Sequence, residues 1–260
     1  MTCLAEAPGG APHHYVAPDY DTIVDSPIVA GNPSVYRFEV DGIPHFLVNQ
    51  GEEGVWDGPR SAADVEKIVR RYREMWGGLP YRKYVFLNML TESGGGLEHK
   101  NSVCMMTSRW NTRNPGSYTG WLGLVSHEYF HAWNVKRLRP VELGPFDYET
   151  PPVTTGLWVA EGLTSYFGDL LAARSGLGGQ DDYLAICSRH ITDLQTKQPG
   201  RLVQTLEQSS SQMFERLAAD KKVDYYVKGP VVGLVLDANI RKHTNGKKSM
   251  DDVIRLEYQR

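Results

Sequence analysis

The stretch His127-Glu128-Tyr129-Phe130-His131 carries the most specific chemical signal in this chain. On an α-helix, side chains four positions apart lie on one face about 5–6 Å apart, so both imidazoles can reach one metal ion. Zinc lowers the pKa of its bound water toward about 7, and a carboxylate beside that water can accept its proton. We therefore expect one Zn²⁺ per chain, with His127 and His131 as ligands and Glu128 as general base.

The neighbouring sequence places the motif on a buried helix. The residues around it are apolar, namely Leu122, Leu124, Val125, Ala132 and Trp133. Pro140 follows several basic residues and predicts the end of this helix. The alternative is a pair of histidines that cap or line a helix without a metal, and the apolar flanks favour the metal site.

Glu161 is the candidate for the third protein ligand that a catalytic zinc needs. It lies in an apolar segment with helical spacing that ends near Gly176. A buried carboxylate needs a partner to offset its desolvation, and zinc would provide one. The alternatives are that Glu161 forms a buried ion pair with an arginine or that it is a carboxylate at the start of a helix. Gly162 costs about 1 kcal/mol inside a helix, so we expect the metal helix to pack closely against it.

The segments HEYFHAWN and LWVAEGLTSYFGDLL resemble the gluzincin zinc metallopeptidases, whose ligands are the two histidines of HExxH and a glutamate in WxxEG. Twenty-nine residues separate His131 from Glu161, and this interval is similar to that of the glycyl aminopeptidase family. The resemblance covers roughly residues 20–260. It implies a thermolysin-like α+β catalytic domain with the zinc cleft between an N-terminal sheet lobe and a mainly helical C-terminal lobe.

A glycine-rich segment resembles the family loop that binds substrate. Gly95-Gly96-Leu97-Glu98-His99 lies between two strand-like runs, residues 84–90 and 102–109, and glycines allow close backbone approach. In the family, an edge strand here pairs with substrate and the glutamate receives its free α-ammonium. The resemblance therefore implies substrate binding by Gly95, Gly96 and Glu98. A flexible hairpin with a solvated glutamate is the alternative.

The segment Asp224-Tyr225-Tyr226-Val227-Lys228-Gly229 precedes an apolar helix predicted over residues 230–242. It resembles the YxKG setting of gluzincins, which implies that the Tyr226 phenol donates a hydrogen bond to the oxyanion of the tetrahedral intermediate. Tyr225 competes for this role, and two ordinary core aromatics are the alternative. Lys228 equally fits a solvated surface charge. The ring N–H groups of the two metal-binding histidines need hydrogen-bond partners, and the candidates are Thr164, Ser165 and Asp169.

Composition excludes several classes of protein. The 260 residues carry a net charge of −3, which gives no electrostatic case for binding nucleic acid or an anionic membrane. Three cysteines, Cys3, Cys104 and Cys187, offer no disulfide framework. Neither a membrane span nor a signal peptide is expected, so the chain would be cytoplasmic if Met1 is its native start.

The predicted organisation is one domain with two lobes. Residues 1–20 are predicted to be a mobile lead-in, followed by a metallopeptidase domain over 21–260 with a sheet-rich lobe at 21–116 and a helical lobe at 117–260. Within the first lobe we expect a hairpin around Asp41-Gly42 and a helix over 61–76. Full-length relatives carry a β domain before this region and a PDZ domain after it, so we expect a catalytic domain truncated at both ends.

These observations predict a zinc aminopeptidase that uses a zinc-activated water to remove N-terminal residues from peptides with a free N-terminus. The resemblance suggests small residues such as glycine or alanine. A zinc endopeptidase with the same site and a catalytically inactive peptide-binding module are the alternatives. The intact Glu128 disfavours the inactive module, and the open coordination position disfavours a structural zinc. The oligomeric state stays open.

Overall fold

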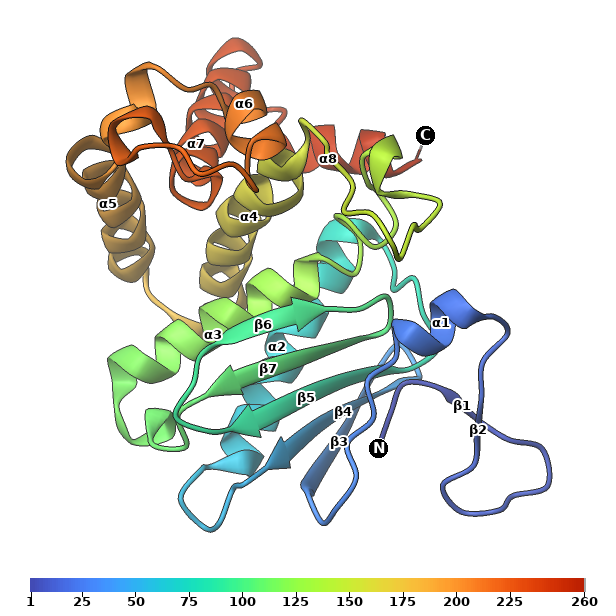
Figure 1. Cartoon of the computed structure of the whole chain (residues 1–260). Helices are drawn as coiled ribbons and strands as arrows, with labels where there is room; N and C mark the ends of the chain where they lie inside the picture. The colour runs from blue at the N-terminus through green and yellow to red at the C-terminus, as the bar shows by residue number, and fades with distance from the viewer. Residues whose placement is uncertain (260) are drawn as a thin grey trace. The chain divides into compact units, whose positions relative to one another are not determined.

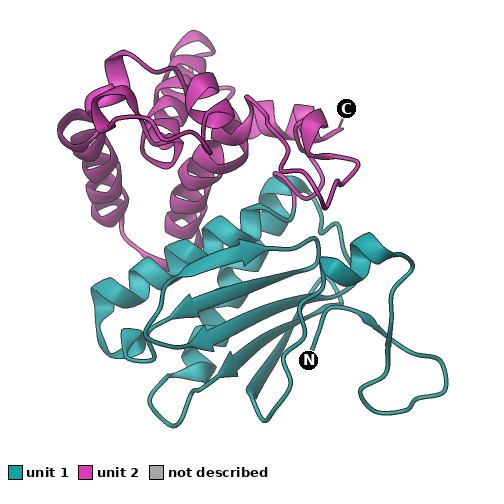
Figure 2. Cartoon of the chain, in the orientation of Figure 1, with its two compact units in different colours: residues 1–132 teal, residues 133–260 magenta. Residues whose placement is uncertain are grey.

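The computed structural model describes residues 1–259, and the chain divides into two compact units, residues 1–132 and the residues from 133 onward (Figures 1 and 2). The first unit combines a sheet with helices, and the second is built of helices. The mixed α+β class predicted from the sequence is therefore confirmed. Among the described residues, no helix combines the length and the apolar character needed to span a membrane.

A five-stranded sheet in the order β3-β4-β5-β7-β6 forms the centre of unit 1. The β4–β5 and β5–β7 pairs are parallel, and the other two pairs are antiparallel. The strands are β3 (Ser34–Val40), β4 (Ile43–Gln50), β5 (Tyr84–Leu90), β6 (Gly95–Glu98) and β7 (Ser102–Thr107). The predicted hairpin is confirmed: Asp41 and Gly42 both have positive φ, as a two-residue turn of this kind requires.

Helices α2 (Gly58–Trp76) and α3 (Pro115–Phe130) pack on one face of this sheet. The helix predicted over 61–76 is thus confirmed, with Asp57 capping its start and Gly77 in the left-handed conformation at its end. On α3, the buried Tyr129 ring packs against Tyr84 and Phe86 of β5. A short 3₁₀ turn at Asn111–Arg113 precedes α3.

A few residues near the start of the chain pack on the other face of the sheet. Met1, Cys3 and Val29 pack against a buried cluster of Val48, Val85 and Leu87. Two short strands and one short helix lie in this segment, β1 (Ala5–Glu6), β2 (Tyr15–Val16) and α1 (Tyr20–Val24). The N-terminal amine donates to the Val29 carbonyl at 2.6 Å, and Lys83 Nζ donates to the Leu4 carbonyl at 2.6 Å. Composition alone does not predict these contacts at the start of the chain.

Unit 2 contains five α-helices among its described residues, and shorter turns join them. The helices are α4 (Leu163–Ala172), α5 (Gln180–Lys197), α6 (Leu206–Ser211), α7 (Tyr225–His243) and α8 (Met250–Gln259). The π-helical turns η3 (Trp158–Gly162) and η4 (Ala173–Leu177) flank α4, and 3₁₀ turns lie at Val141–Leu143, Pro199–Leu202 and Ala219–Lys221. Gly176, at φ 75°, ends the segment where the sequence predicts.

The boundary between the compact units follows α3, whereas the sequence suggests a helical lobe that starts at residue 117. The reason is packing: α3 contacts β6, β7 and α2, so it belongs with the sheet.

Candidate metal centre and peptide-binding strand

Helix α3 presents the two motif histidines. Asn114 caps its start by accepting from the Ser117 N–H at 3.0 Å, and Trp121 Nε1 donates to Asn88 Oδ1 on β5 at 3.2 Å. The helix ends at Phe130, so the predicted end near Pro140 is wrong. His131 still has helical dihedrals (φ −61°, ψ −19°), while Val135 at φ 114° takes the chain out of the helical path. The four-residue spacing of the histidines is therefore kept.

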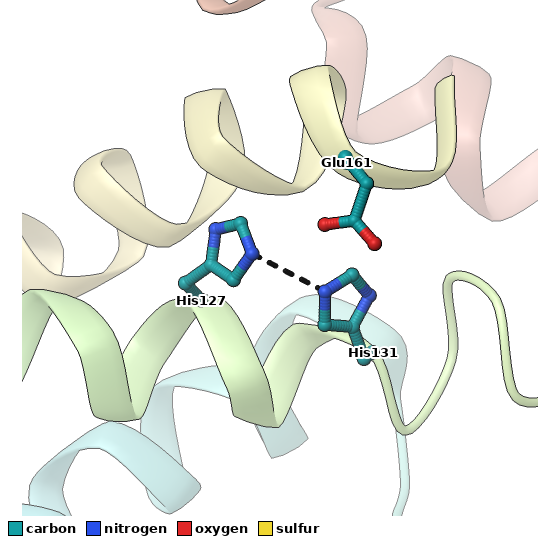
Figure 3. A group of neighbouring side chains, drawn as sticks. All are labelled: His127, His131 and Glu161. Atoms are coloured by element: carbon teal, nitrogen blue, oxygen red, sulfur yellow. Dashed lines mark hydrogen bonds between the residues drawn. The ribbon is translucent and has the colours of Figure 1, made fainter. Parts of the chain in front are cut away.

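The ring nitrogens of the two histidines face each other. His127 Nε2 and His131 Nε2 are 3.2 Å apart, the interaction drawn in Figure 3. The rings meet edge to face, and His131 is buried at 1% exposure. Two imidazole nitrogens directed at the same point are what a shared metal ion requires. Figure 3 also draws Glu161, the predicted third ligand, which belongs to unit 2.

Strand β6 crosses α3 at Glu128. A Cβ atom on Gly96 would overlap the Glu128 side chain, so the backbone of β6 lies directly against this buried carboxylate. Ligand atoms of Glu98, Glu128 and His131 lie within 4.8 Å of one another. The strand and the helix therefore bring the predicted amine-binding and general-base carboxylates together within unit 1.

The outer edge of β6 is open within the sheet, because the strand order ends there and β6 pairs with β7. An edge strand has backbone N–H and C=O groups with which an extended peptide can pair. Gly95 has φ 122°, a conformation that favours glycine.

Asp25 anchors the hairpin that carries β6. Its carboxylate accepts from the Lys100 N–H at 2.7 Å and lies 3.3 Å from His99 Nδ1. His99 directly follows Glu98, so the N-terminal segment holds the hairpin next to the carboxylate. Sequence reasoning did not find Asp25, because it lies 74 residues from His99 and carries no motif signal.

A buried polar chain links α3 to the sheet. His45 Nδ1 lies 2.9 Å from the Ile43 carbonyl and its Nε2 lies 3.0 Å from Tyr81 Oη, which is hydrogen bonded to Tyr129 Oη. Burial lowers the pKa of His45 to about 4, so the ring is neutral at pH 7. Its Nδ1–H then donates to the carbonyl, Tyr81 donates to Nε2, and Tyr129 donates to Tyr81. Sequence reasoning did not find this chain either.

In unit 2, Glu161 lies on the π-helical turn η3, a geometry often found at functional sites. Asn134, which follows the second histidine in the sequence, holds this turn. Its Nδ2 donates to the Val159 carbonyl at 2.8 Å and contacts Thr164 Oγ1 at 3.0 Å. Thr164 is thereby linked to the turn that carries Glu161, as is Ser165, whose Oγ donates to the Glu161 carbonyl at 3.0 Å. Asp169 instead pairs with His190 at 2.8 Å.

Gly162 does mark a close approach, but its neighbour is α7 rather than the expected metal helix. A Cβ on Gly162 would lie 2.8 Å from Gly229 Cα and 2.9 Å from the Tyr225 carbonyl oxygen. Two facing glycines thus let η3 and α7 pack backbone to backbone. The second glycine of this pair belongs to the segment that contains Tyr226.

The tyrosine segment opens α7, which starts at Tyr225, five residues before the predicted 230. Asp224 caps it by accepting from the Tyr226 N–H at 2.8 Å, and Tyr226 is 44% exposed. Burial raises the pKa of Tyr225, as do the negative charges of Glu161 and Asp224. Lys228 is partly exposed: its Nζ donates to two backbone carbonyls of unit 2, and burial lowers its pKa.

Comparisons with known proteins agree with these observations. The chain superposes over its whole length on a crystal structure of an aminopeptidase N family protein from Idiomarina loihiensis, with TM-score 0.92 and 30% identity, and covers 46% of that chain. An M1 zinc metallopeptidase mutant from Deinococcus radiodurans, bound to a Tyr-Ser-Ala substrate, matches 88% of this chain with TM-score 0.52 and 14% identity.

The chain covers 44% of the Deinococcus protein, so it spans less than half the length of either structure. No curated protein sequence matches it. The model of the M61 glycyl aminopeptidase family matches residues 120–232, a stretch that contains both histidines, Glu161 and Tyr226. Residues 120–232 of the chain therefore match the M61 glycyl aminopeptidase family of peptidases.

Proposed function

We propose that this chain is a zinc-dependent aminopeptidase that hydrolyses the N-terminal residue of peptides, with residues 21–260 as its catalytic domain. The observation that carries the proposal is the pair of facing Nε2 atoms of His127 and His131, 3.2 Å apart, with Glu128 beside them on the same helix. The M61 family match and the likeness to a peptide-bound zinc metallopeptidase support it.

The donor set suits zinc. Two imidazole nitrogens and the carboxylate of Glu161 are the ligand types of catalytic zinc sites, and three protein ligands leave a position open. His127, His131 and Glu161 would hold one zinc ion per chain. When bound, the ion would polarise the scissile carbonyl and lower the pKa of a water molecule to about 7.

Glu128 is the general base in this proposal. Its carboxylate is buried at 5% exposure on α3, one residue from His127, so it can accept a proton from the attacking water. The same group then transfers the proton to the leaving amine, which must be protonated before it can depart. Tyr226 is proposed to donate a hydrogen bond to the oxyanion that forms on the carbonyl.

Glu98 and β6 account for the proposed preference for a free N-terminus. Glu98 shares a cluster with Glu128 and His131, so a substrate ammonium bound to Glu98 would lie one residue from the reacting carbonyl. The open edge of β6 at Gly95 and Gly96 offers backbone groups to the peptide. A preference for small residues such as glycine or alanine rests on the family resemblance.

The proposal is tested by hydrolysis of glycyl and alanyl chromogenic amides beside their N-acetyl forms, on protein with quantified zinc. We expect cleavage of the free-amine forms alone, loss of activity with a chelator, and about one zinc per chain. Glu128→Gln keeps every proposed ligand, so zinc-loaded but inactive variant protein would exclude a contaminating peptidase as the source of turnover.

Other outcomes would identify the rival functions. Cleavage of N-acetyl and free-amine substrates alike would establish an endopeptidase. Zinc binding without cleavage of any substrate would overturn the enzyme proposal and favour an inactive peptide-binding module. Loss of zinc in Glu128→Gln would show that Glu128 is a ligand, contrary to its proposed role.

A further inference from the structure

Val223, three residues before Tyr226, is fully buried, and side chains from one segment hold both of its backbone polar groups. Its N–H donates to Gln204 Oε1 at 2.8 Å, and its carbonyl accepts from Ser209 Oγ at 2.6 Å. Gln204 is itself buried at 5% exposure, and its Nε2 donates to Gln212 Oε1 at 3.1 Å. The chain entering α7 therefore depends on these side chains for its backbone hydrogen bonds.

The same segment holds the next residues as well. Gln198 Oε1 accepts from the N–H of Asp224, the α7 cap, at 2.9 Å. Lys228 Nζ donates to the carbonyls of Arg201 and Gln204 at 3.0 Å each, so the lysine of the tyrosine motif is bound to this segment. Gly200 lies against the backbone of residue 222, where a side chain would overlap it.

Another hydrogen bond joins this segment to η3, the turn that carries the proposed ligand Glu161. The Trp158 N–H, at the first residue of η3, donates to Ser210 Oγ at 3.0 Å. The Ser210 hydroxyl donates in turn to the Leu206 carbonyl at 2.8 Å, which leaves its lone pairs directed at Trp158. Ser210 is 1% exposed, so water does not replace this contact.

We propose that residues 198–210, which we call the brace segment, position Tyr226 and Glu161 relative to each other within unit 2. Gln204 fixes the entry to α7, and Ser210 fixes the start of η3. This inference rests on the proposed function. These are positioning residues: they touch no reacting atom, but a zinc ligand and an oxyanion donor lose effectiveness when displaced by about 1 Å.

The Ser210 contact is tested by zinc affinity, measured by competition with a chelating dye. Ser210→Ala should weaken zinc binding about 10-fold, as loss of a partner behind a metal ligand typically does. Ser211→Ala is the matched control, because Ser211 Oγ contacts only the Gln208 carbonyl of its own helix, at 3.5 Å, among the hydrogen bonds described. Equal affinities of the two variants would overturn the role of Ser210.

The Gln204 contact is tested by a matched pair of variants. Gln204→Met keeps the side-chain length but removes the acceptor for the Val223 N–H, whereas Gln204→Glu retains an acceptor oxygen. We expect Gln204→Met to lower kcat about 10-fold with unchanged KM and zinc affinity, and Gln204→Glu to recover part of the loss. Amide hydrogen exchange over residues 223–229 should be faster in Gln204→Met.

If Gln204→Met changes neither the amide hydrogen exchange of residues 223–229 nor kcat, the proposed role of the brace segment is wrong. If Gln204→Met does not fold, Lys228→Met removes the two carbonyl contacts from the other side and is judged by the same exchange measurement. A wild-type protein that binds zinc but hydrolyses no peptide would refute the proposed function, while zinc affinity and exchange would still decide the inference about the brace segment.

Discussion

Gly96 lies so close to Glu128 that a Cβ atom on residue 96 would overlap the glutamate side chain. The φ angle of Gly96 does not lie in the left-handed region, so its backbone conformation does not demand a glycine. The requirement comes from packing: β6 passes directly over the proposed general base. This contact connects the proposed substrate-binding strand to the proposed catalytic carboxylate within one compact unit.

Gly96→Ala should therefore reduce hydrolysis while leaving zinc bound. The added methyl group must displace either Glu128 or β6, and a displacement of about 1 Å at a reacting group can cost about 100-fold in rate. Steady-state kinetics on a free-amine chromogenic amide, together with zinc content, would measure both effects.

Gly94→Ala is the matched control for this substitution. Gly94 lies in the same hairpin, but no atom lies within 4 Å of the position that its Cβ would occupy. We expect near wild-type activity for Gly94→Ala. Equal losses in both variants would mean that hairpin flexibility, rather than contact with Glu128, explains the glycine.

Local patterns in the sequence predicted the elements that carry the site, and long-range contacts supplied the rest. The i,i+4 histidines, the Asp41-Gly42 turn and the apolar spacing around Glu161 are local, so they could be read directly. The His45–Tyr81 contact spans 36 residues and the His99–Asp25 contact spans 74, and no short motif encodes such pairs.

Two predictions from local sequence failed: the position where the metal helix ends and the element that packs against Gly162. Basic residues and Pro140 suggested a long metal helix, but the positive φ of Val135 departs from the helical path soon after His131. Gly162 correctly signalled a close approach, yet a glycine does not identify the neighbour that requires it. That neighbour, Gly229, lies 67 positions later in the chain and becomes evident only once η3 and α7 are packed.

Glu98→Ala should weaken the hydrolysis of free-amine substrates far more than that of N-blocked ones. A carboxylate that binds an ammonium contributes about 1.5–3 kcal/mol, which corresponds to about 10- to 100-fold in kcat/KM. Kinetics on glycyl amides with and without an N-acetyl group would measure the difference. If both substrates lose activity equally, or if Glu98→Gln retains full selectivity for the free amine, Glu98 does not bind the α-ammonium as a charge.

Tyr226→Phe should lower kcat with little change in zinc content. Removal of one oxyanion donor typically costs about 100- to 1000-fold in kcat. Tyr225→Phe is the matched comparison, because Tyr225 is adjacent, its ring lies 4.9 Å from that of Tyr226, and its pKa responds to Glu161. If Tyr225→Phe lowers kcat more than Tyr226→Phe does, Tyr225 is the oxyanion donor. If neither substitution lowers kcat, neither tyrosine has this role.

His45 should make the protein sensitive to mild acid. Burial lowers its pKa from 6.5 to about 4 in the folded chain, so the unfolded chain binds the extra proton first as the pH falls. Above pH 6.5 the neutral His45 places no penalty on the folded chain. As the pH falls from 6.5 toward 4, the stability of the folded chain decreases progressively. Urea unfolding of wild type and His45→Gln at pH 7 and pH 5 would test this. The variant should lose less stability over this interval, and parallel losses would contradict the argument.

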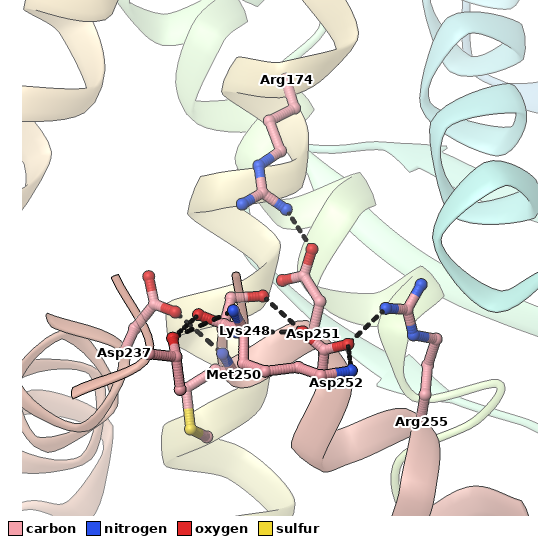
Figure 4. Close-up of polar contacts among 9 residues, drawn as sticks. Arg174, Asp237, Lys248, Met250, Asp251, Asp252 and Arg255 are labelled. Atoms are coloured by element: carbon pink, nitrogen blue, oxygen red, sulfur yellow. Dashed lines mark hydrogen bonds and ion pairs between the residues drawn. The ribbon is translucent and has the colours of Figure 1, made fainter. Parts of the chain in front are cut away.

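Asp237→Asn should destabilise unit 2 by detaching α8 from α7 (Figure 4). The Asp237 carboxylate accepts from the Met250 N–H at 2.8 Å and from Arg241 Nε at 2.7 Å, at 8% exposure. Burial acts to raise its pKa, but the hydrogen bonds outweigh this and lower it below 3.8. Its ionised form therefore stabilises the fold above that pH, and this contribution is lost as the pH falls through the lowered value.

We expect Asp237→Asn to lower the free energy of unfolding by about 1–3 kcal/mol at pH 7, as loss of a buried charged acceptor does. Asp193→Asn removes the partner of Lys197 in a more exposed pair on α5 and should cost less than about 1 kcal/mol. Chemical denaturation at pH 7 and pH 3 would measure both variants. The Asp237→Asn deficit should shrink at pH 3, because this pH lies below the ordinary pKa of 3.8 and Asp237 of the unfolded wild-type chain is then mostly protonated. A deficit equal to that of Asp193→Asn at pH 7 would show that α8 is held by its apolar contacts instead.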